Sequence, residues 1–352
     1  MISIRRYTNQ DLDTVKEFFF KAFEGDIPRK IDAFSWIQTQ NPFADRDNNY
    51  FLIFFNRKLV GYWGIMPMKC YHFGNPIQAL FSHEALVDPT YRGRGLAAKL
   101  LREVNRSDRF LVSLWHNEKI LSILEKEGWS NIGNFRPLRK IYKLENLIES
   151  KLRSRFLQKP LIQFSTLWLK MRSSPKKTTI EYKIEFMNKC GAEFDNFFMR
   201  VAPKLGIVSD RTSATLNWKY RDIPHKKYTL LTAMREGHMC GYTVLRVENQ
   251  EKTIRKGTIV DLLADPDEPE PLSCLIDRCE EIFLNNGVDF SVCQVSLPIF
   301  RNIFKEKGYS ETKIRPTDSL YIYNDEMSPD RDSVRDIRNW YFTYGESDAD
   351  MW

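Results

Sequence analysis

The chain has 352 residues, of which 42% are hydrophobic and 28% charged, an ordinary globular composition with room for two domains. Its formal net charge of +7 suits an anionic ligand but does not single out nucleic acid, and the sequence contains no nucleic-acid-binding motif. The six cysteines neither form a CxxC motif nor cluster with the five histidines, so we expect no metal site.

The chain begins "MISIRRYTNQDLD", without the apolar run of a signal peptide, and no later apolar run is long enough to cross a bilayer. We therefore expect a cytoplasmic protein that is not an integral membrane protein. Residues 2–6 predict a short strand, and Asn9 or Asp11 is placed to cap a helix through "LDTVKEFFFKAF". Two β runs around "NRK" predict a hairpin, and "PIQALFSHEALV" predicts a third, long strand.

The stretch "VDPTYRGRGLAAKLL", residues 87–101, places a basic, glycine-rich turn at the start of a helix. One face of that helix is apolar: Leu96, Ala97, Leu100, Leu101 and Val104. A helix N-terminus carries unpaired N–H groups and a partial positive charge, and glycines let an anion approach the backbone. The turn therefore predicts a phosphate or pyrophosphate site, although it lacks the Lys-Ser/Thr of a P-loop.

A strand at "RFLVSLW" follows, and then a helix in "NEKILSILEKEGW" that Gly128 ends. Five landmarks of this first half recur in the second half at offsets of 177 to 182 residues: Trp36 and Trp218, Pro42 and Pro224, Gly61 and Gly241, Pro89 and Pro266, Gly128 and Gly308. Because both order and spacing recur, we expect two copies of one α+β unit. The basic segment between them predicts a linker with some helix, the alternative being a membrane-surface or nucleic-acid contact.

This order of elements, with a Val-x-Pro-x-x-Arg-Gly-x-Gly turn, resembles the GNAT superfamily of acyl-CoA-dependent N-acyltransferases. "VDPTYRGRGLA" is similar to the family's pyrophosphate motif, and "WHNEKILSILEKEGW" is similar to its second CoA-contacting segment. The resemblance implies that the amides of residues 93–97 hold the CoA pyrophosphate, while backbone near Leu86 and Val87 holds the thioester carbonyl and pantetheine. The implied acyl-CoA site consists of Leu86, Val87, Arg92, Gly93, Arg94, Gly95, Leu96, Ala97 and Asn117.

The implied fold is α+β: two tandem GNAT-like domains, each a mixed, mostly antiparallel β-sheet flanked by helices. The expected parts are an N-terminal domain with the acyl-CoA site (1–145), a basic linker with some helix (146–185) and a degenerate C-terminal copy (186–352). The second copy replaces the glycine turn with "LADPDEPEPLSCLI", whose acidic side chains would repel a pyrophosphate and whose prolines supply no N–H. We expect this copy to shape the acceptor site or to brace the first copy.

Amide formation needs a neutral amine, and an alkylamine such as lysine titrates at about 10.4, so a base helps at neutral pH. The strand before the turn holds His83 and Glu84. Side chains alternate along a strand, so only one of the two faces the cleft unless a bulge intervenes, and His83 is expected to share a face with Ala85 and Val87. His83 is the first candidate for the base and Glu84 the second.

The ending, "NWYFTYGESDADMW", combines aromatic and acidic residues. The layout resembles tandem-GNAT enzymes that acylate nucleotide-linked amino sugars, such as dTDP-3-amino-3,6-dideoxyhexoses, for surface polysaccharides, using acetyl-CoA or a hydroxyacyl-CoA such as 3-hydroxybutanoyl-CoA. The implied acceptor-binding residues are Trp36, Tyr341, Tyr344, Glu346 and Asp348. The alternatives are an acetyltransferase acting on aminoglycoside, peptide or protein amines, and a non-catalytic acyl-CoA-binding regulator.

Overall fold

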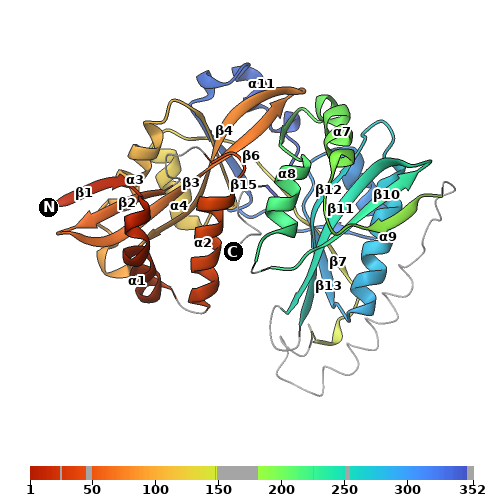
Figure 1. The fold of residues 1–352 in the computed structure, drawn as a ribbon, viewed down its shortest axis with the longest axis horizontal. Helices are drawn as coiled ribbons and strands as arrows, with labels where there is room; N and C mark the ends of the chain where they lie inside the picture. Colours follow the sequence, from red (N-terminus) through yellow and green to blue (C-terminus); the bar gives the residue numbers. More distant parts are fainter. Residues whose placement is uncertain are drawn as a thin grey trace.

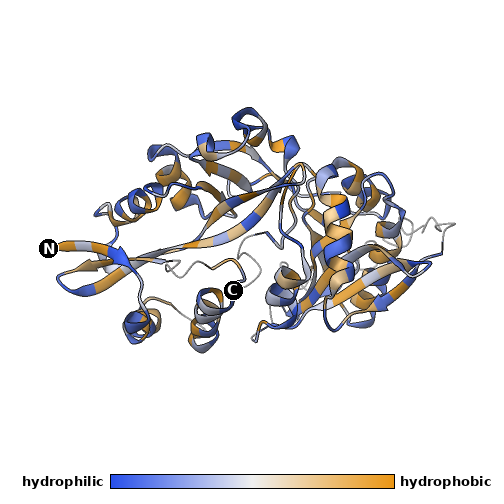
Figure 2. Ribbon diagram, turned by 45° about the horizontal axis from the view of Figure 1, so that its top comes forward, coloured by the Kyte–Doolittle hydropathy of each residue, from blue (hydrophilic) through white to orange (hydrophobic). Residues whose placement is uncertain are grey.

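The computed structural model describes residues 1–23, 26–44, 50–146, 148, 181–224, 226–249 and 254–346. The chain forms two lobes that lie side by side, each built on one β-sheet (Figure 1). Hydrophobic residues gather where helices pack on the sheets, and polar residues cover the outside (Figure 2). Both sheets are mixed and mostly antiparallel, which confirms the predicted α+β class.

The first lobe begins with β1 (Ile2–Arg6), followed by α1 (Leu12–Ala22) and α2 (Ile27–Gln40). Neither predicted cap of α1 acts as a simple N-cap. A 3-10 turn comes first, and the Asp11 carboxylate accepts hydrogen bonds from the backbone N–H and the hydroxyl of Thr8, each at 2.8 Å. The Asp11 carboxylate thus satisfies the backbone N–H of Thr8, as the N3 side chain of a capping box does.

Three antiparallel strands follow: β2 (Tyr50–Phe55), β3 (Lys58–His72) and β4 (Asn75–Val87). Asn56 and Arg57 both have positive φ, 49° and 67°, as a two-residue hairpin turn that matches strand twist requires. The lobe continues with α3 (Leu96–Asn105), β5 (Phe110–Leu114), α4 (Glu118–Lys126) and β6 (Ser130–Asn134). Strand β5 runs parallel to β4, and α3 covers the sheet with its predicted apolar face.

The second lobe repeats this plan. Its strands are β8 (Lys183–Phe186), β10 (Thr229–Arg235), β11 (His238–Asn249), β12 (Arg255–Ala264), β13 (Phe290–Cys293) and β14 (Ser310–Glu311). Its helices are α7 (Ala192–Val201), α8 (Ser213–Leu216), α9 (Glu270–Asn285) and α10 (Pro298–Glu306), and α11 (Arg331–Arg335) comes later in the chain. Residues 146–185, expected as a linker, lie mostly outside the described residues, and β8 begins within that range.

The two lobes exchange one strand each. Strand β7 (Leu138–Ile141) pairs with β13 and β14 in the second sheet, and β15 (Ser319–Tyr323) pairs with β5 and β6 in the first. The sheet orders β1-β2-β3-β4-β5-β15-β6 and β8-β10-β11-β12-β13-β7-β14 therefore correspond position by position. The sheets do not follow the expected boundaries at 145 and 186, because each sheet is completed by a strand from the other half.

The lobes share one continuous core. A hydrophobic cluster contains Phe81 and Phe110 of the first sheet together with Leu262 and Leu275 of the second lobe. The short strand β9 (Ile207–Ser209) pairs with the end of β3. Two of the repeated landmarks also meet, since the indole N–H of Trp36 donates to the carbonyl oxygen of Trp218 at 3.3 Å.

Candidate active site

The glycine turn lies between β4 and α3. Gly93 and Gly95 have positive φ, 77° and 71°, a conformation that most other residues adopt only under strain. A Cβ built at either glycine would meet nothing within 4 Å, so the space beside this backbone is open. Gly95 is the N-cap of α3 and offers no capping side chain, so the first N–H groups of α3 are available to an anion.

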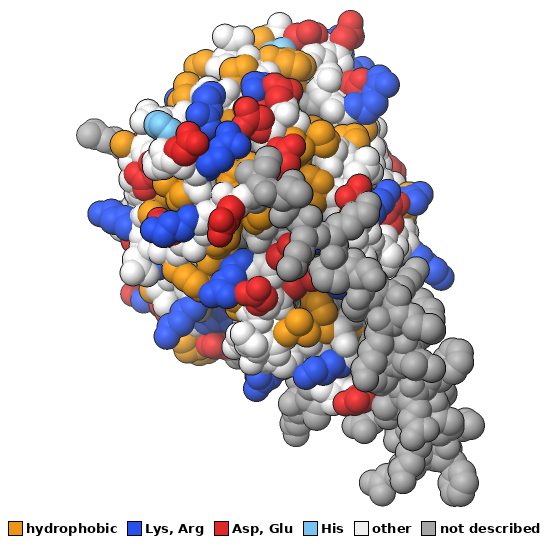
Figure 3. Space-filling view, turned by 90° about the vertical axis from the view of Figure 1, so that its right-hand side faces the viewer, with side chains coloured by type: hydrophobic (Ala, Val, Ile, Leu, Met, Phe, Trp, Pro, Cys, Tyr) orange, Lys and Arg blue, Asp and Glu red, His pale blue; other side chains and the backbone are white. Residues whose placement is uncertain are grey.

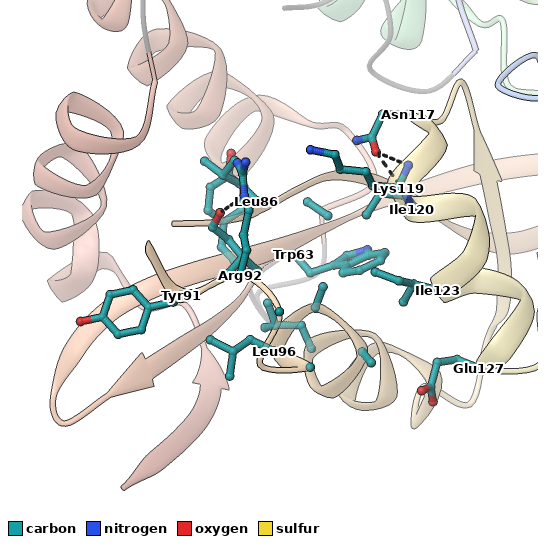
Figure 4. A pocket seen from close by; sticks show the side chains of 18 of the residues that line it. Trp63, Leu86, Tyr91, Arg92, Leu96, Asn117, Lys119, Ile120, Ile123 and Glu127 are labelled. Atoms are coloured by element: carbon teal, nitrogen blue, oxygen red, sulfur yellow. Dashed lines mark hydrogen bonds between the residues drawn. The ribbon is translucent and has the colours of Figure 1, made fainter. Parts of the chain in front are cut away.

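A cavity of about 770 Å³, named here the large cavity, extends from this turn between β4, α3 and α4 (Figure 4). The turn contributes Arg92, Gly93 and Gly95, and Asn117 caps α4 at the opposite side by accepting the N–H groups of Lys119 and Ile120 at 3.1 and 3.2 Å. The interior wall is apolar: Trp63, Ala85, Val87, Ile120 and Ile123. Such a cavity combines an anion site at one end with a channel for an apolar or amide-bearing chain.

Strands β4 and β5 diverge beside this cavity. Their pairing ends at Ser82 and Ser113, whereas β4 continues as a strand to Val87. The backbone of β4 beyond this point borders the cavity as a strand edge, where an extended ligand with amide groups can pair. Predicted site residues Leu86, Val87, Arg92, Gly93, Gly95, Leu96, Ala97 and Asn117 all line the large cavity.

A β-bulge lies on β4 next to the divergence. Trp63 pairs with Ala85 and Gly64 pairs with His83, so Glu84 is an extra residue. The expectation that His83 shares a face with Ala85 and Val87 is therefore wrong. His83 stacks edge-on against Tyr50, 5.1 Å between ring centroids, on the α1/α2 side of the sheet, while Ala85 and Val87 pack on the α3 side.

Because of the bulge, His83 and Glu84 both line one cavity of about 300 Å³, named here the small cavity. Its other walls come from the end of β5 and from Lys30 near the start of α2. It shares Trp63, Ala85, Asn117 and Ile120 with the large cavity. The Glu84 carboxylate lies 3.9 Å from the Lys30 ammonium. The geometry thus brings both candidate bases to the place where the strands diverge, and their roles stay predictions.

The small cavity also contains His116, which sequence reasoning missed. It directly precedes Asn117, and this adjacency within "WHNEKIL" was the available signal. Its Nε2 lies 2.9 Å from the Ser113 hydroxyl, and its ring stacks edge-on against Tyr321 with 5.1 Å between centroids. Burial lowers the pKa of His116 to about 4, so the ring is neutral at pH 7.

The comparisons with known proteins agree with this geometry. Residues 3–109 match the family described as the acetyltransferase (GNAT) domain. The first part of the chain is therefore similar in sequence to this domain family. An uncharacterized N-acetyltransferase of Methanocaldococcus jannaschii is 29% identical over 126 residues, which cover 32% of this chain and 52% of that protein. The match thus spans about half the length of this curated relative.

Solved structures share the fold across nearly the whole chain. A GCN5-related N-acetyltransferase from Anabaena variabilis aligns with a TM-score of 0.63 and 14% identity, covering 92% of this chain and 72% of that one. The N-myristoyltransferase of Saccharomyces cerevisiae, solved with bound myristoyl-CoA, aligns with a TM-score of 0.58 and 12% identity, covering 92% and 82%. At these identities the likeness establishes the fold of the chain and nothing finer.

The two arginines of the glycine turn differ in position. Arg92 lines the large cavity, and its Nε donates to the carbonyl oxygen of Val87 at 3.1 Å. Arg94 does not line that cavity and lies over the rings of Tyr91 and Phe55, at 5.2 and 5.7 Å from their centroids. Of the predicted acyl-CoA residues, Arg94 is therefore the one that the structure places outside the large cavity.

This difference predicts the effects of two matched substitutions. Arg92→Ala should raise the Kd of CoA by at least about 10-fold, because a charge-assisted hydrogen bond to a phosphate is worth roughly 1.5–3 kcal/mol. Arg94→Ala removes the same charge but should raise the Kd by less than about 3-fold. Titration calorimetry with CoA measures both, and equal effects would contradict the assignment of Arg92 to the anion site.

The residues expected to bind the acceptor lie elsewhere. Tyr341 is fully buried and its hydroxyl donates to the carbonyl oxygen of Leu262 at 2.5 Å. Glu346 is also buried and forms an ion pair with Arg211. The side chain of Tyr344 is half-buried, and its ring centroid lies 5.9 Å from that of Trp115. The indole N–H of Trp36 donates to the carbonyl oxygen of Trp218, between the lobes. None of these four lines the large or the small cavity, and Asp348 lies outside the described residues.

The segment 340–346 instead fills the divergence between β12 and β13, the counterpart of the cleft in the first lobe. The pairing of these strands ends at Ile259 and Cys293, while β12 continues to Ala264. Gly345 N–H donates to the carbonyl oxygen of Val260 at 2.8 Å on one side, and Ser296 N–H donates to that of Phe342 at 3.1 Å on the other. The second copy therefore holds its own chain where the first copy has a cavity.

The acidic turn of the second copy is neutralised by neighbouring cations. The Lys204 ammonium lies 2.7 Å from carboxylate oxygens of both Asp265 and Asp267, and Arg235 lies 3.5 Å from Glu268. The acidic side chains of this turn therefore bind cationic side chains of the protein itself. That this copy does not hold a pyrophosphate stays a prediction.

The pKa of His116 makes folding stability depend on pH. Its folded pKa, about 4, lies below an unfolded value of about 6.5. The unfolded chain therefore binds more protons between these values, and stability present above about pH 6.5 is lost as the pH falls toward 4. Between pH 7 and pH 5 the wild type should lose roughly 1–2 kcal/mol more than His116→Gln in urea unfolding. Parallel losses in both proteins would contradict the lowered pKa.

Three further features concern metal ligands, membrane-spanning helices and a surface for nucleic acid. Within the described ranges, no three histidine, cysteine, aspartate or glutamate side chains are grouped as metal ligands. No helix among these residues combines the length and apolarity needed to cross a bilayer. The face shown in Figure 3 intersperses lysine and arginine with aspartate and glutamate, so this face of the second lobe is not a continuous basic surface for nucleic acid.

Proposed function

We propose that the protein is an acyl-CoA-dependent N-acyltransferase that transfers a short acyl group from CoA to an amine by direct attack in a ternary complex. One observation carries this proposal: the glycine turn, the exposed strand edge of β4 and the small cavity lie in series along one path. A pyrophosphate at the turn, a chain of amides along β4 and a reacting thioester at the divergence match these three parts in order.

The residues present fit CoA. The amides of residues 93–97 meet the pyrophosphate, because Gly93 and Gly95 leave space that a Cβ would occupy. Pantetheine amides pair with the edge of β4 at residues 85–87. Backbone N–H groups near Leu86 and Val87 then stabilise the oxyanion that develops on the thioester carbonyl.

The reaction needs no covalent enzyme intermediate. The amine nitrogen attacks the thioester carbonyl carbon, the C–N bond forms, the C–S bond breaks and the nitrogen gives up one proton. The CoA thiolate is a tolerable leaving group because free thiols titrate at about 8.5. No general acid is therefore required for the departure of the thiolate.

The size of the small cavity supports a short acyl group. Its volume is about 300 Å³, and Trp63, Trp115 and Ile120 close its sides. Acetyl or a small hydroxyacyl group leaves room there for the acceptor amine. The nucleotide-linked amino sugar of a surface-polysaccharide pathway is the acceptor that the sequence resemblance favours, and in this proposal its amine enters the small cavity.

Thiol release tests the proposal. Acetyl-CoA and 3-hydroxybutanoyl-CoA are each incubated with an amino-sugar nucleotide, an aminoglycoside, a lysine peptide and a simple alkylamine. Release of CoA thiol that depends on one of the amines supports an N-acyltransferase, and the amine that supports it defines the acceptor class. Tight CoA binding without thiol release for any acceptor would instead support the non-catalytic regulator.

A further inference from the structure

The backbone around His116 is arranged to place this side chain at the divergence of the strands. Trp115, directly before it, has a positive φ of 57°, an uncommon conformation for a bulky aromatic residue. Such strain costs about 1–3 kcal/mol and persists where surrounding structure enforces it. The His116 backbone N–H donates to the carbonyl oxygen of Thr317 at 3.2 Å, which ties the strained turn to the chain just before the exchanged strand β15.

The ring of His116 is fixed on two sides. Tyr321 of β15 lies edge-on at 5.1 Å, and the Ser113 hydroxyl lies 2.9 Å from Nε2. The Tyr321 hydroxyl donates to Glu125 at 2.8 Å and so holds its own orientation. Neither of these contacts is a hydrogen bond to the other ring nitrogen, Nδ1.

Nδ1 of His116 is shielded from solvent and has no hydrogen-bond partner among the described residues. Leaving a buried polar atom unpaired costs about 1–3 kcal/mol, which a ligand that pairs with it recovers. The neutral ring carries a proton on one nitrogen only. When Nε2–H donates to Ser113, Nδ1 has a free lone pair, and His116 is one of the residues that line the small cavity.

We propose that His116 Nδ1 accepts the proton of the attacking amine, with Ser113 as the residue that sets its tautomer. This inference rests on the proposed function and names the group that completes its chemistry. As the amine nitrogen bonds to the carbonyl carbon, one N–H proton moves to Nδ1, and the C–S electron pair leaves with sulfur. The product is an amide, a CoA thiolate and an imidazolium, which returns its proton to solvent.

The decisive experiment compares His116→Ala, His83→Ala and His72→Ala in thiol release with the best amine of the panel. His72 is the matched control, because its Nε2 pairs with the Ser333 hydroxyl at 3.0 Å, as His116 does with Ser113, but it lines neither cavity. His116→Ala should lower kcat by about 100-fold, with the KM for acyl-CoA changed less than about 3-fold. Added imidazole should restore part of kcat for this variant.

Rescue by imidazole separates a proton acceptor from a purely structural residue. An unchanged kcat in His116→Ala, or a loss of kcat that imidazole does not restore, overturns the proposal for His116. In either case, thiol release by the wild type still supports the proposed function. Imidazole rescue of His83→Ala in place of His116→Ala assigns the proton to His83 and also overturns it. A wild type that releases no thiol with any amine overturns the proposed function and this inference together.

A second measurement keeps the inference testable if His116→Ala folds poorly. Nitrogen-15 labelling of the five histidines gives ring signals that distinguish a protonated from an unprotonated nitrogen. At pH 7, His116 should show an unprotonated Nδ1, and Ser113→Ala should mix the two tautomers and lower kcat. A protonated Nδ1 in the wild type contradicts the proposal.

Discussion

Replacing Arg211 with alanine is expected to lower the free energy of unfolding by about 3–5 kcal/mol. The arginine is 2% exposed and forms ion pairs with Asp261 and Glu346, both of which are also buried. Its guanidinium also lies 4.9 Å from the centroid of the Tyr341 ring. The substitution leaves two carboxylates in the interior without their cation, which costs more than the ion pairs themselves contribute.

The matched control is Arg338→Ala. Arg338 pairs with Asp336 at 2.6 Å, but its side chain is 85% exposed, so its loss should change stability by less than about 1 kcal/mol. Urea unfolding followed by tryptophan fluorescence measures both variants. Similar unfolding midpoints for the two variants would show that the cluster of Arg211, Asp261 and Glu346 does not hold the segment 340–346 in place.

Replacing Gly95 with aspartate is expected to raise the Kd of CoA by at least about 100-fold, equivalent to about 2.7 kcal/mol. The carboxylate would stand at the N-terminus of α3, where it satisfies the N–H groups that otherwise meet the pyrophosphate and repels the phosphates. The second copy of the unit already carries acidic residues in its turn. Aspartate tolerates positive φ better than most residues, so the fold should survive.

Gly237→Asp is the matched control for the backbone. Gly237 has a φ of 79°, and a Cβ built there also meets nothing within 4 Å, but it lies in the hairpin between β10 and β11. Both variants therefore carry a similar conformational cost, and only the Gly95 variant should lose CoA in titration calorimetry. A Kd that changes less than 3-fold in Gly95→Asp would reject the pyrophosphate assignment.

The features that the sequence predicted well depend on residues that are close together in the chain. The turn at Gly93 and Gly95 is specified by residues next to one another in the chain, as is the apolar face of α3. The side to which His83 points was mispredicted because the bulge at Glu84 depends on pairing with β3, which strand alternation does not include. His116 was missed because its value depends on Ser113 and Tyr321, and Tyr321 comes from the other half of the chain.

The residues predicted to bind the acceptor depend even more on distant parts of the chain. The composition of the C-terminal stretch suggested a binding surface, since aromatic and acidic residues serve both recognition and packing. Tyr341 and Glu346 are interior residues because they bind distant parts of the chain: Leu262 of β12 lies 79 residues before Tyr341, and Arg211 lies 135 residues before Glu346. No local pattern records such a partner, and only the folded chain identifies it.

The exchange of β7 and β15 has a consequence for biosynthesis. A chain emerging from the ribosome delivers β1 to β6 first, yet β5 and β6 have no common neighbour until residues 319–323 follow. The sheet of the first lobe therefore lacks one strand while almost the entire second lobe is synthesised. Such long-range pairing slows folding and leaves strand edges exposed to other chains. The cleft becomes complete only after residues 319–323 have been synthesised, because β15 also supplies Tyr321 beside His116.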